Sequence, residues 1–191
     1  MTDHKRIILA ITGASGAIYG LRALETLSDL EVEVHLVVSE MGAWVLTEET
    51  GKTPAMLARL AARTYAPDDL AAPIASGSYP TEGMLIVPCS IKTLSGVANS
   101  YTDSLIPRAA DVCLKEGRPL LLAVRETPLH SGHLELMARA AHAGAIIFPP
   151  IPAFYSQPTT IDALVSATVG RMLARIGVDN EAYQPWQGSR D

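Results

Sequence analysis

Apolar residues along this chain cluster in short blocks that alternate with longer segments of mixed polarity. Five runs, most of them continuously apolar, have the pattern of parallel strands covered on both faces: 7–11, 32–38, 84–87, 120–124 and 145–148. Between and after them, apolar residues recur at helical spacing, which predicts helices over 17–30, 40–49, 54–63, 93–99, 105–116, 132–143 and 161–176. This alternation predicts an α/β fold: a three-layer, doubly wound, mostly parallel sheet of the Rossmann-like or flavodoxin-like kind.

Glycine and proline mark the boundaries of these elements. Gly117 and Gly144 each follow a predicted helix and precede a predicted strand, where a left-handed C-cap favours glycine. The proline- and glycine-rich segments 72–83 and 148–158 are predicted to be loops, which either carry function or only connect elements. We see no repeat and no linker, so we expect residues 1–191 to form one domain.

The charge and cysteine content narrow the class of protein. Fifteen Lys and Arg against twenty Asp and Glu give a net charge of -5 without a basic run, so we expect no nucleic-acid partner. The apolar stretches are much shorter than the roughly 20 residues of a membrane span, so none is expected. We interpret the N-terminal apolar segment as a strand. Two cysteines without CxxC spacing fit a reducing compartment, and we expect a cytoplasmic protein.

The first predicted strand is followed by the loop "TGASGAIYG". Its glycine spacing is not G-x-G-x-x-G and no Walker lysine follows, so neither NAD nor ATP is indicated. Ser39 follows the second strand, where dinucleotide folds place an acid. A hydroxyl there suits a phosphate or a ribityl chain, which favours a mononucleotide such as FMN. The alternative is a glycine turn required only for close packing.

A second loop, "PCSIKTLSG", follows the strand at 84–87. Ser90, Lys92 and Thr93 stand at the start of its helix and could share a ligand with the first loop. Ordinary N-capping explains the serine and threonine equally well.

Six motifs occur in order: "GASGAIYG", "ASGS", "PCSIKTLSG", "RAADVCLKEGRPL", "VRETPLHSGHLELM" and "PPIPAFYSQP". Together the chain resembles the UbiX-like flavin prenyltransferases over nearly its whole length. The resemblance implies a flavodoxin-like or Rossmann-like FMN-binding subunit that joins the dimethylallyl group of dimethylallyl monophosphate to N5 and C6 of FMN. It also implies a homododecamer whose product, prenylated FMN, serves a UbiD-type decarboxylase, as in ubiquinone biosynthesis.

The resemblance also implies roles for individual residues. The flavin contacts fall on Gly13, Ala14, Ser15, Ser39, Ser90, Ile91, Lys92, Thr93 and Arg125. The contacts to the prenyl donor fall on Lys115, Arg125, Glu126, Tyr155 and Arg171, with the loop of Ser76 and Gly77 nearby and Arg108 and Trp186 close to the site. Proton handling falls on Ser15, Glu49 and Glu126.

The chemistry itself requires some of these groups. A departing phosphate gains negative charge, which preorganised cations such as Lys115, Arg125 and Arg171 would stabilise. We expect no metal, because Asp68 and Asp69 form an isolated acidic pair. Glu126, or the phosphate itself, could accept the proton lost from flavin C6. Because an electron-rich flavin is the better nucleophile, we expect reduced FMN to react.

Arg108 and Lys115 lie seven residues apart, so they share one face of the predicted helix and could point at one anion. A solvated basic stripe is the alternative.

Other interpretations remain open. An FMN-dependent decarboxylase of the cysteine-decarboxylating kind would carry an active-site histidine and a "PxMNxxMW" clamp, neither of which appears here. An aromatic-acid decarboxylase and a flavin carrier without chemistry are further candidates. His130 and His133 are spaced like metal ligands but lack further ligands, which favours helix capping or a role in supporting residues of the site. Cys89 is a core residue or, alternatively, a nucleophile.

Overall fold

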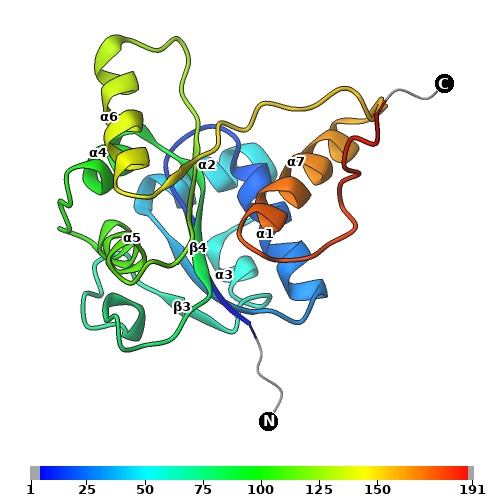
Figure 1. Ribbon diagram of the computed structural model, residues 1–191. Helices are drawn as coiled ribbons and strands as arrows, with labels where there is room; N and C mark the ends of the chain where they lie inside the picture. Colours follow the sequence, from blue (N-terminus) through cyan, green and yellow to red (C-terminus); the bar gives the residue numbers. More distant parts are fainter. Residues whose placement is uncertain (1–4, 189–191) are drawn as a thin grey trace.

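The structure is a computed structural model that describes residues 5–188, and its centre is a six-stranded parallel sheet (Figure 1). The strands are β1 (Arg6–Ile11), β2 (Glu33–Val38), β3 (Arg63–Tyr65), β4 (Gly83–Cys89), β5 (Leu120–Val124) and β6 (Ile146–Ile147). Their order is β3-β2-β1-β4-β5-β6, the order of a doubly wound Rossmann sheet. The predicted fold class is therefore confirmed.

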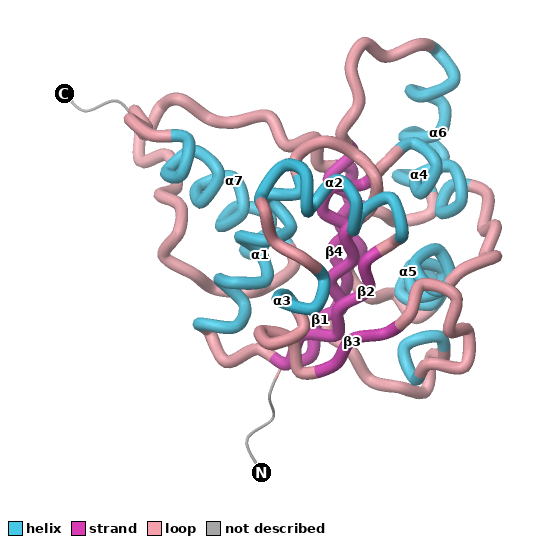
Figure 2. Tube along the Cα trace, turned by 180° about the vertical axis from the view of Figure 1, so that it is seen from behind, coloured by secondary structure: helices cyan, strands magenta, loops and turns pink. Residues whose placement is uncertain are grey.

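Helices cover both faces of the sheet (Figure 2). One face packs against α1 (Ala17–Asp29), α2 (Glu40–Thr50), α3 (Pro54–Leu57) and α7 (Ile161–Arg175). The other packs against α4 (Ile91–Ala98), α5 (Leu105–Lys115) and α6 (Ser131–His142). Along β1, Leu9 and Ile11 face the first layer and Ile8 the second, and all three are buried. No helix between residues 5 and 188 is long and apolar enough to span a membrane.

The predicted helix over 54–63 is wrong in its second half. Helix α3 ends at Leu57, and after a turn Arg63–Tyr65 forms the edge strand β3. This strand is three residues long with an exposed arginine and threonine, so it has no apolar run to reveal it. By contrast, Gly117 and Gly144 have φ angles of 65° and 107°, which confirms their left-handed caps. The predicted loop at 72–83 contains only the short 3-10 helix η1 (Pro73–Ala75).

A polar cluster interrupts the apolar pattern of β2. Nε and Nη2 of Arg6 donate to the two carboxylate oxygens of Glu33, each at 2.9 Å. The fully buried His35 lies between Glu33, 2.9 Å from its Nε2, and the hydroxyl of Tyr65, 2.7 Å from its Nδ1. These side chains satisfy one another, which allows polar groups inside a buried strand.

We expect Glu33→Gln to destabilise the protein by about 2 kcal/mol at neutral pH, allowing for the 26% of this side chain that is exposed. The hydrogen bond from Arg6 lowers the pKa of Glu33 from 4.5 to about 2. The ionised carboxylate therefore stabilises the fold above pH 4.5, and this contribution is lost as the pH falls from 4.5 toward 2. Urea unfolding at about pH 7 and about pH 3 measures the difference. If Glu33→Gln lowers the free energy of unfolding equally at both pH values, ionisation of Glu33 does not stabilise the fold as described.

Candidate active site

A cavity of about 500 Å³ opens beyond the carboxyl ends of β1, β2, β4 and β5. It lies where the strand order reverses between β1 and β4, the place where such sheets bind ligands. All nine residues predicted as flavin contacts line it: 13–15, Ser39, 90–93 and Arg125. Glu126 lines it as well.

The first glycine loop does not leave its helix N-terminus open. The backbone N–H groups of Gly16 and Ala17 donate to Oε2 of Glu49 at 2.9 and 2.8 Å. Glu49 reaches them from the last turn of α2, and an acid at a helix N-terminus is electrostatically favourable. These two amides, which a helix N-terminus would otherwise offer to an anion, are therefore already bound to a carboxylate of the chain itself.

Close packing also requires glycines in this loop. A Cβ on Gly13 would lie 2.5 Å from Cβ of Met41, and one on Gly20 would lie 2.3 Å from the carbonyl oxygen of Val87. Both distances are shorter than any side chain tolerates. Close packing, the alternative explanation for these glycines, therefore applies at Gly13 and Gly20. Gly13 also lines the cavity.

Two of the hydroxyl groups at the cavity, those of Ser39 and Ser90, cap helices. Oγ of Ser39 accepts from the N–H of Gly42 at 3.0 Å, and Oγ of Ser90 accepts from the N–H of Thr93 at 3.3 Å. The starts of α2 and α4 therefore both meet the cavity, and Lys92 lines it beside the second of them. A helix N-terminus next to a lysine is favourable for an anion.

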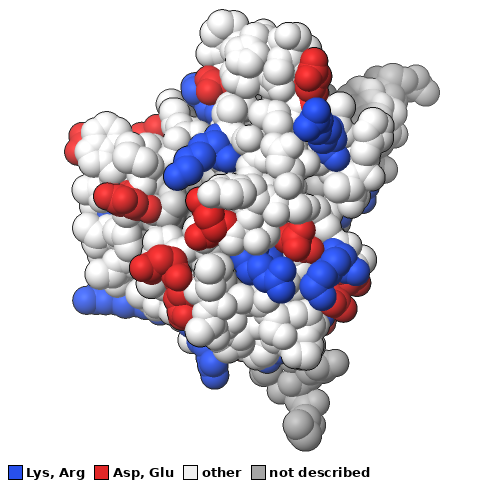
Figure 3. Space-filling view, turned by 90° about the vertical axis from the view of Figure 1, so that its left-hand side faces the viewer, with Lys and Arg blue, Asp and Glu red and all other residues white. Residues whose placement is uncertain are grey.

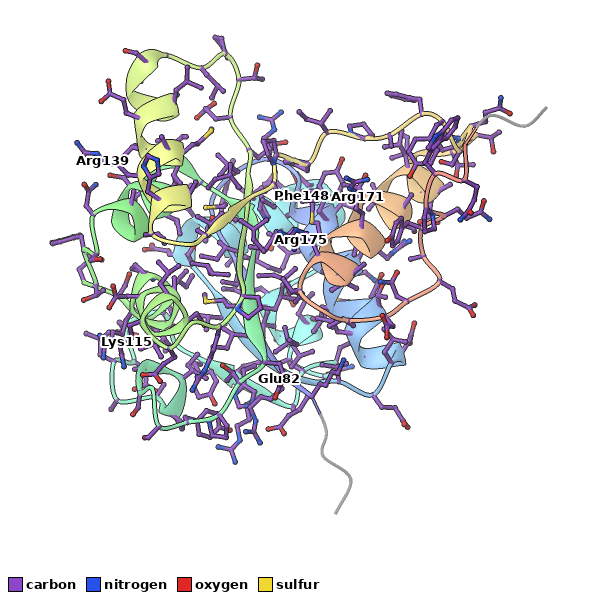
Figure 4. All side chains as sticks on the ribbon, in the orientation of Figure 1. Glu82, Lys115, Arg139, Phe148, Arg171 and Arg175 are labelled. Carbon is purple, nitrogen blue, oxygen red and sulfur yellow. The ribbon has the colours of Figure 1, made fainter. Side chains whose placement is uncertain are left out.

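Lys115 lies far from this cavity in the same chain. The loop before α5 and its first turn line the cavity, whereas Lys115 ends the helix, whose eleven residues span roughly 15 Å. Lys115 ends the helix near the amino edge of the sheet, on the same side as Glu82 (Figure 4). There its ammonium pairs with Glu116 and lies so close to Gly77 that a Cβ on this glycine would be 2.7 Å from Nζ.

Arg108 faces the same segment as Lys115. Its Nε donates to the carbonyl oxygen of Ala75 at 3.1 Å, and its Nη1 lies 3.4 Å from Asp111. The two basic residues share a helix face, as predicted, but each is paired with an acid of the chain. Figure 3, which views the side formed by α4, α5 and α6, shows basic and acidic side chains interspersed there.

Tyr155, Arg171 and Trp186 form a third group, next to α7. Tyr155 packs edge-on against Trp186 with 5.6 Å between ring centres, and its hydroxyl donates to the carbonyl oxygen of Gln184 at 3.0 Å. Tyr155 and Arg171 line a cavity of about 30 Å³. Figure 4 shows Arg171 on the opposite side of the molecule from Lys115. A single subunit therefore does not bring the predicted donor contacts together.

His130 and the strand-end cysteine have structural roles. Nδ1 of His130 accepts from the N–H of Gly132 at 3.1 Å, which confirms that it caps α6. Its ring lies 3.6 Å from that of His133. Cys89 is fully buried, and burial raises the pKa of its thiol, so the core interpretation is confirmed. Over residues 5–188, no group of three or more His, Cys, Asp or Glu could hold a metal ion.

Comparison with known proteins now adds to this geometry. Residues 1–173 match the flavoprotein family. Flavin prenyltransferase UbiX of Salmonella typhimurium is 54% identical over 188 residues, which are 97% of this chain and 100% of that protein. A solved structure of AnUbiX (PadA1) in complex with FMN and dimethylallyl pyrophosphate has a TM-score of 0.95 at 43% identity, covering 98% of this chain and 100% of the other.

A second solved structure is a dodecameric FMN-dependent Ubix-like decarboxylase from Escherichia coli O157:H7. It has a TM-score of 0.93 at 43% identity and covers 96% of this chain and 100% of the other. Sequence and structure agree over nearly the full length of the chain, which belongs to the UbiX-like flavin prenyltransferases.

Proposed function

We propose that this protein transfers the dimethylallyl group of dimethylallyl monophosphate to N5 and C6 of reduced FMN, giving prenylated FMN. The observation that carries the proposal is the cavity at the strand-order reversal, which gathers every predicted flavin contact together with Arg125 and Glu126. The relationship to a flavin prenyltransferase at 54% identity supports it.

The residues of the cavity would hold the phosphate of FMN at the second loop and its ring system at the first. Ser90, Lys92 and Thr93 offer a phosphate a helix N-terminus and a cation. The first amides of α1 are bound to Glu49, so the glycine loop suits the ring system rather than the phosphate. When bound, reduced FMN supplies the nucleophilic ring atoms.

The chain's own groups provide the remaining chemistry. Lys115, Arg125 and Arg171 stabilise the phosphate as its bond to carbon breaks; the arginines can bind it through two N–H groups and the lysine acts as a point charge. The hydroxyl of Tyr155 donates a hydrogen bond to it. These cations supply the positive charge that magnesium provides in other prenyl transfers, so we propose a metal-independent reaction.

Joining one five-carbon unit to both N5 and C6 breaks the C–O bond of the donor for one bond and uses its C=C bond for the other, so the alkene takes up one proton while N5 and C6 each lose one. The acids and one hydroxyl of the chain would move these protons. Glu126, which lines the cavity beside Arg125, or the phosphate itself accepts the proton lost from C6. Ser15 and Glu49 handle the proton at N5: Glu49 binds the N–H of Gly16, the residue next to Ser15.

A complete donor site requires several subunits. The three groups of predicted donor residues lie at separate places on one chain, and the dodecameric relative shows that this fold assembles. The segment around Tyr155 also exposes large apolar side chains, with Ile151 77% and Phe154 68% exposed. We therefore propose a homo-oligomer, a dodecamer by analogy, in which neighbouring subunits complete each site.

The cellular setting is part of the same proposal. Two buried free cysteines fit a reducing compartment, so we propose a cytoplasmic protein. Prenylated FMN would pass to a UbiD-type decarboxylase. We also propose that residues 1–191 form one flavoprotein domain, supported by the single sheet and by the family match over 1–173.

The test is anaerobic incubation of the protein with reduced FMN and dimethylallyl monophosphate, followed by mass spectrometry of the flavin. We expect the flavin to gain one five-carbon unit. Parallel reactions with the diphosphate donor, an aromatic acid and a cysteine-containing peptide test the alternatives. Unchanged FMN, together with carbon dioxide released from the aromatic acid or from the peptide, would overturn the proposal in favour of a decarboxylase.

A further inference from the structure

Residues 76–81, which we name the 76–81 turn, lie between η1 and β4 at the amino edge of the sheet. The turn contains Ser76 and Gly77, and the ion pair of Lys115 and Glu116 lies against Gly77, with the carboxylate of Glu116 nearest to it. Within it, Oγ of Ser76 lies 2.9 Å from Oγ of Ser78. Its backbone is irregular: the carbonyl oxygen of Ser76 accepts from the N–H of Tyr79 at 3.2 Å, and side chains bind several of the other carbonyl groups.

One guanidinium group binds two of these carbonyl oxygens and a hydroxyl group of the turn. Nη2 of Arg118 donates to the carbonyl oxygen of Gly77 at 2.7 Å. Nη1 of Arg118 donates to the carbonyl oxygen of Tyr79 at 2.9 Å and to Oγ1 of Thr81 at 3.2 Å. Arg118 thus binds three acceptors in the turn through two nitrogens held in one plane, a geometry that the single ammonium nitrogen of lysine does not reproduce.

The end of α5 places Arg118 beside Lys115. Gly117 has a φ of 65°, and the backbone N–H of Arg118 then donates to the carbonyl oxygen of Cys113 at 2.8 Å. This left-handed cap reverses the chain immediately after Lys115 and brings both basic residues to Gly77. Their environments differ, because the side chain of Lys115 is 48% exposed whereas both terminal nitrogens of Arg118 are bound to the turn.

Two further arginines hold the ends of the same segment. Nη1 of Arg6, on β1, donates to the carbonyl oxygen of Pro80 at 2.8 Å, and its guanidinium lies 4.7 Å from the ring centre of Tyr79. Arg108, on α5, donates to the carbonyl oxygen of Ala75. Because β1, α5 and the connection after α5 contribute these donors, the turn is fixed against the sheet and α5 together.

We propose that Arg118 is a positioning residue for the reaction: it holds the 76–81 turn in the shape that supports Lys115, and so fixes where Lys115 presents its ammonium. The donor phosphate does not contact Arg118, which acts through Lys115. The part of this inference that concerns the donor rests on the proposed function. The part that concerns the turn does not.

The first test is a double-mutant cycle. Arg118→Ala should lower kcat/KM for dimethylallyl monophosphate about tenfold, the effect of losing a hydrogen bond to a charged group. FMN affinity should stay unchanged. In the Lys115→Ala background the same change should cost less than about twofold, because the residue through which it acts is absent. An equal fall in both backgrounds, or no fall in the first, would overturn the proposal.

The second test does not depend on activity. Hydrogen exchange at the amides of Ser76 to Tyr79 should be at least about tenfold faster in Arg118→Ala, because the turn opens more readily. Arg118→Lys keeps the positive charge but not the planar guanidinium, and it should also speed hydrogen exchange. It replaces Arg118→Ala in this test if the alanine variant does not fold. Arg59→Ala, a change at an exposed arginine after α3, is the matched control and should leave exchange unchanged.

These measurements separate the two proposals. A wild-type protein that does not prenylate FMN ends the proposed function, whereas exchange at the turn still tests the role of Arg118. Exchange that is unchanged in Arg118→Ala overturns that role whatever the enzyme does.

Discussion

Replacing Lys115 with alanine should lower kcat about 10²-fold to 10³-fold, the usual cost of removing one preorganised group that stabilises transition-state charge. The physical reason is the charge that gathers on the departing phosphate. The result would be unexpected from one subunit alone, because Lys115 lies roughly 15 Å along α5 from the cavity. Lys52→Ala, at another exposed lysine, is the matched control and should keep full activity.

Mixed oligomers test where Lys115 acts. Arg125 lines the cavity of its own chain, whereas Lys115 would reach the cavity of a neighbour. Co-expressed Lys115→Ala and Arg125→Ala subunits should therefore form some sites with both residues intact, and random mixing restores up to about a quarter of wild-type activity. If both residues acted within one chain, no mixture would exceed the activity of its parents.

Replacing Glu49 should separate a structural from a chemical role. Glu49→Ala removes the acceptor for the N–H groups of Gly16 and Ala17 and should cost about 1 to 2 kcal/mol of stability. Glu49→Gln keeps an oxygen acceptor, so we expect most of that stability to return. Both variants should lose about 10²-fold in kcat, because neither has the carboxylate that we assign to proton transfer at N5. Thermal unfolding and the flavin mass assay measure the two effects.

FMN binding completes this test. Glu48→Gln, at the exposed neighbouring acid, controls for a change of charge on α2 and should be neutral. If the N-terminus of α1 held the flavin phosphate, removing Glu49 would free two amides and tighten FMN binding. We expect no tightening, and full activity in Glu49→Gln would contradict the chemical role.

The strands that carry the cavity were predictable because continuous apolar runs at 7–11 and 120–124 leave little choice of structure. The edge strand β3 was not, since Arg63 and Thr64 are exposed and its stability comes from pairing with β2. The polar cluster of β2 was not predictable from the local sequence either. His35 is acceptable there because Glu33 binds one of its ring nitrogens and Tyr65, thirty residues away, binds the other.

The residues of the candidate site also divide into those that a local sequence pattern predicts and those that it does not. Residues following strands, such as Ser39 and Ser90, reach the cavity because all parallel strands end at one edge. The contact of Glu49 with Gly16 joins residues 33 apart, and no local pattern encodes it. For Lys115 the signal was present: a residue that ends a helix just before a parallel strand must lie at the amino edge, away from the cavity.

The central claim is that bond breaking in the donor and alkylation of the flavin are one reaction at this cavity. The most direct measurement follows released phosphate and flavin mass together in one anaerobic sample of protein, reduced FMN and dimethylallyl monophosphate. We predict that each flavin that gains a five-carbon unit is matched by one phosphate, and that Arg125→Ala suppresses both. Phosphate released without any change in the mass of the flavin would contradict the account.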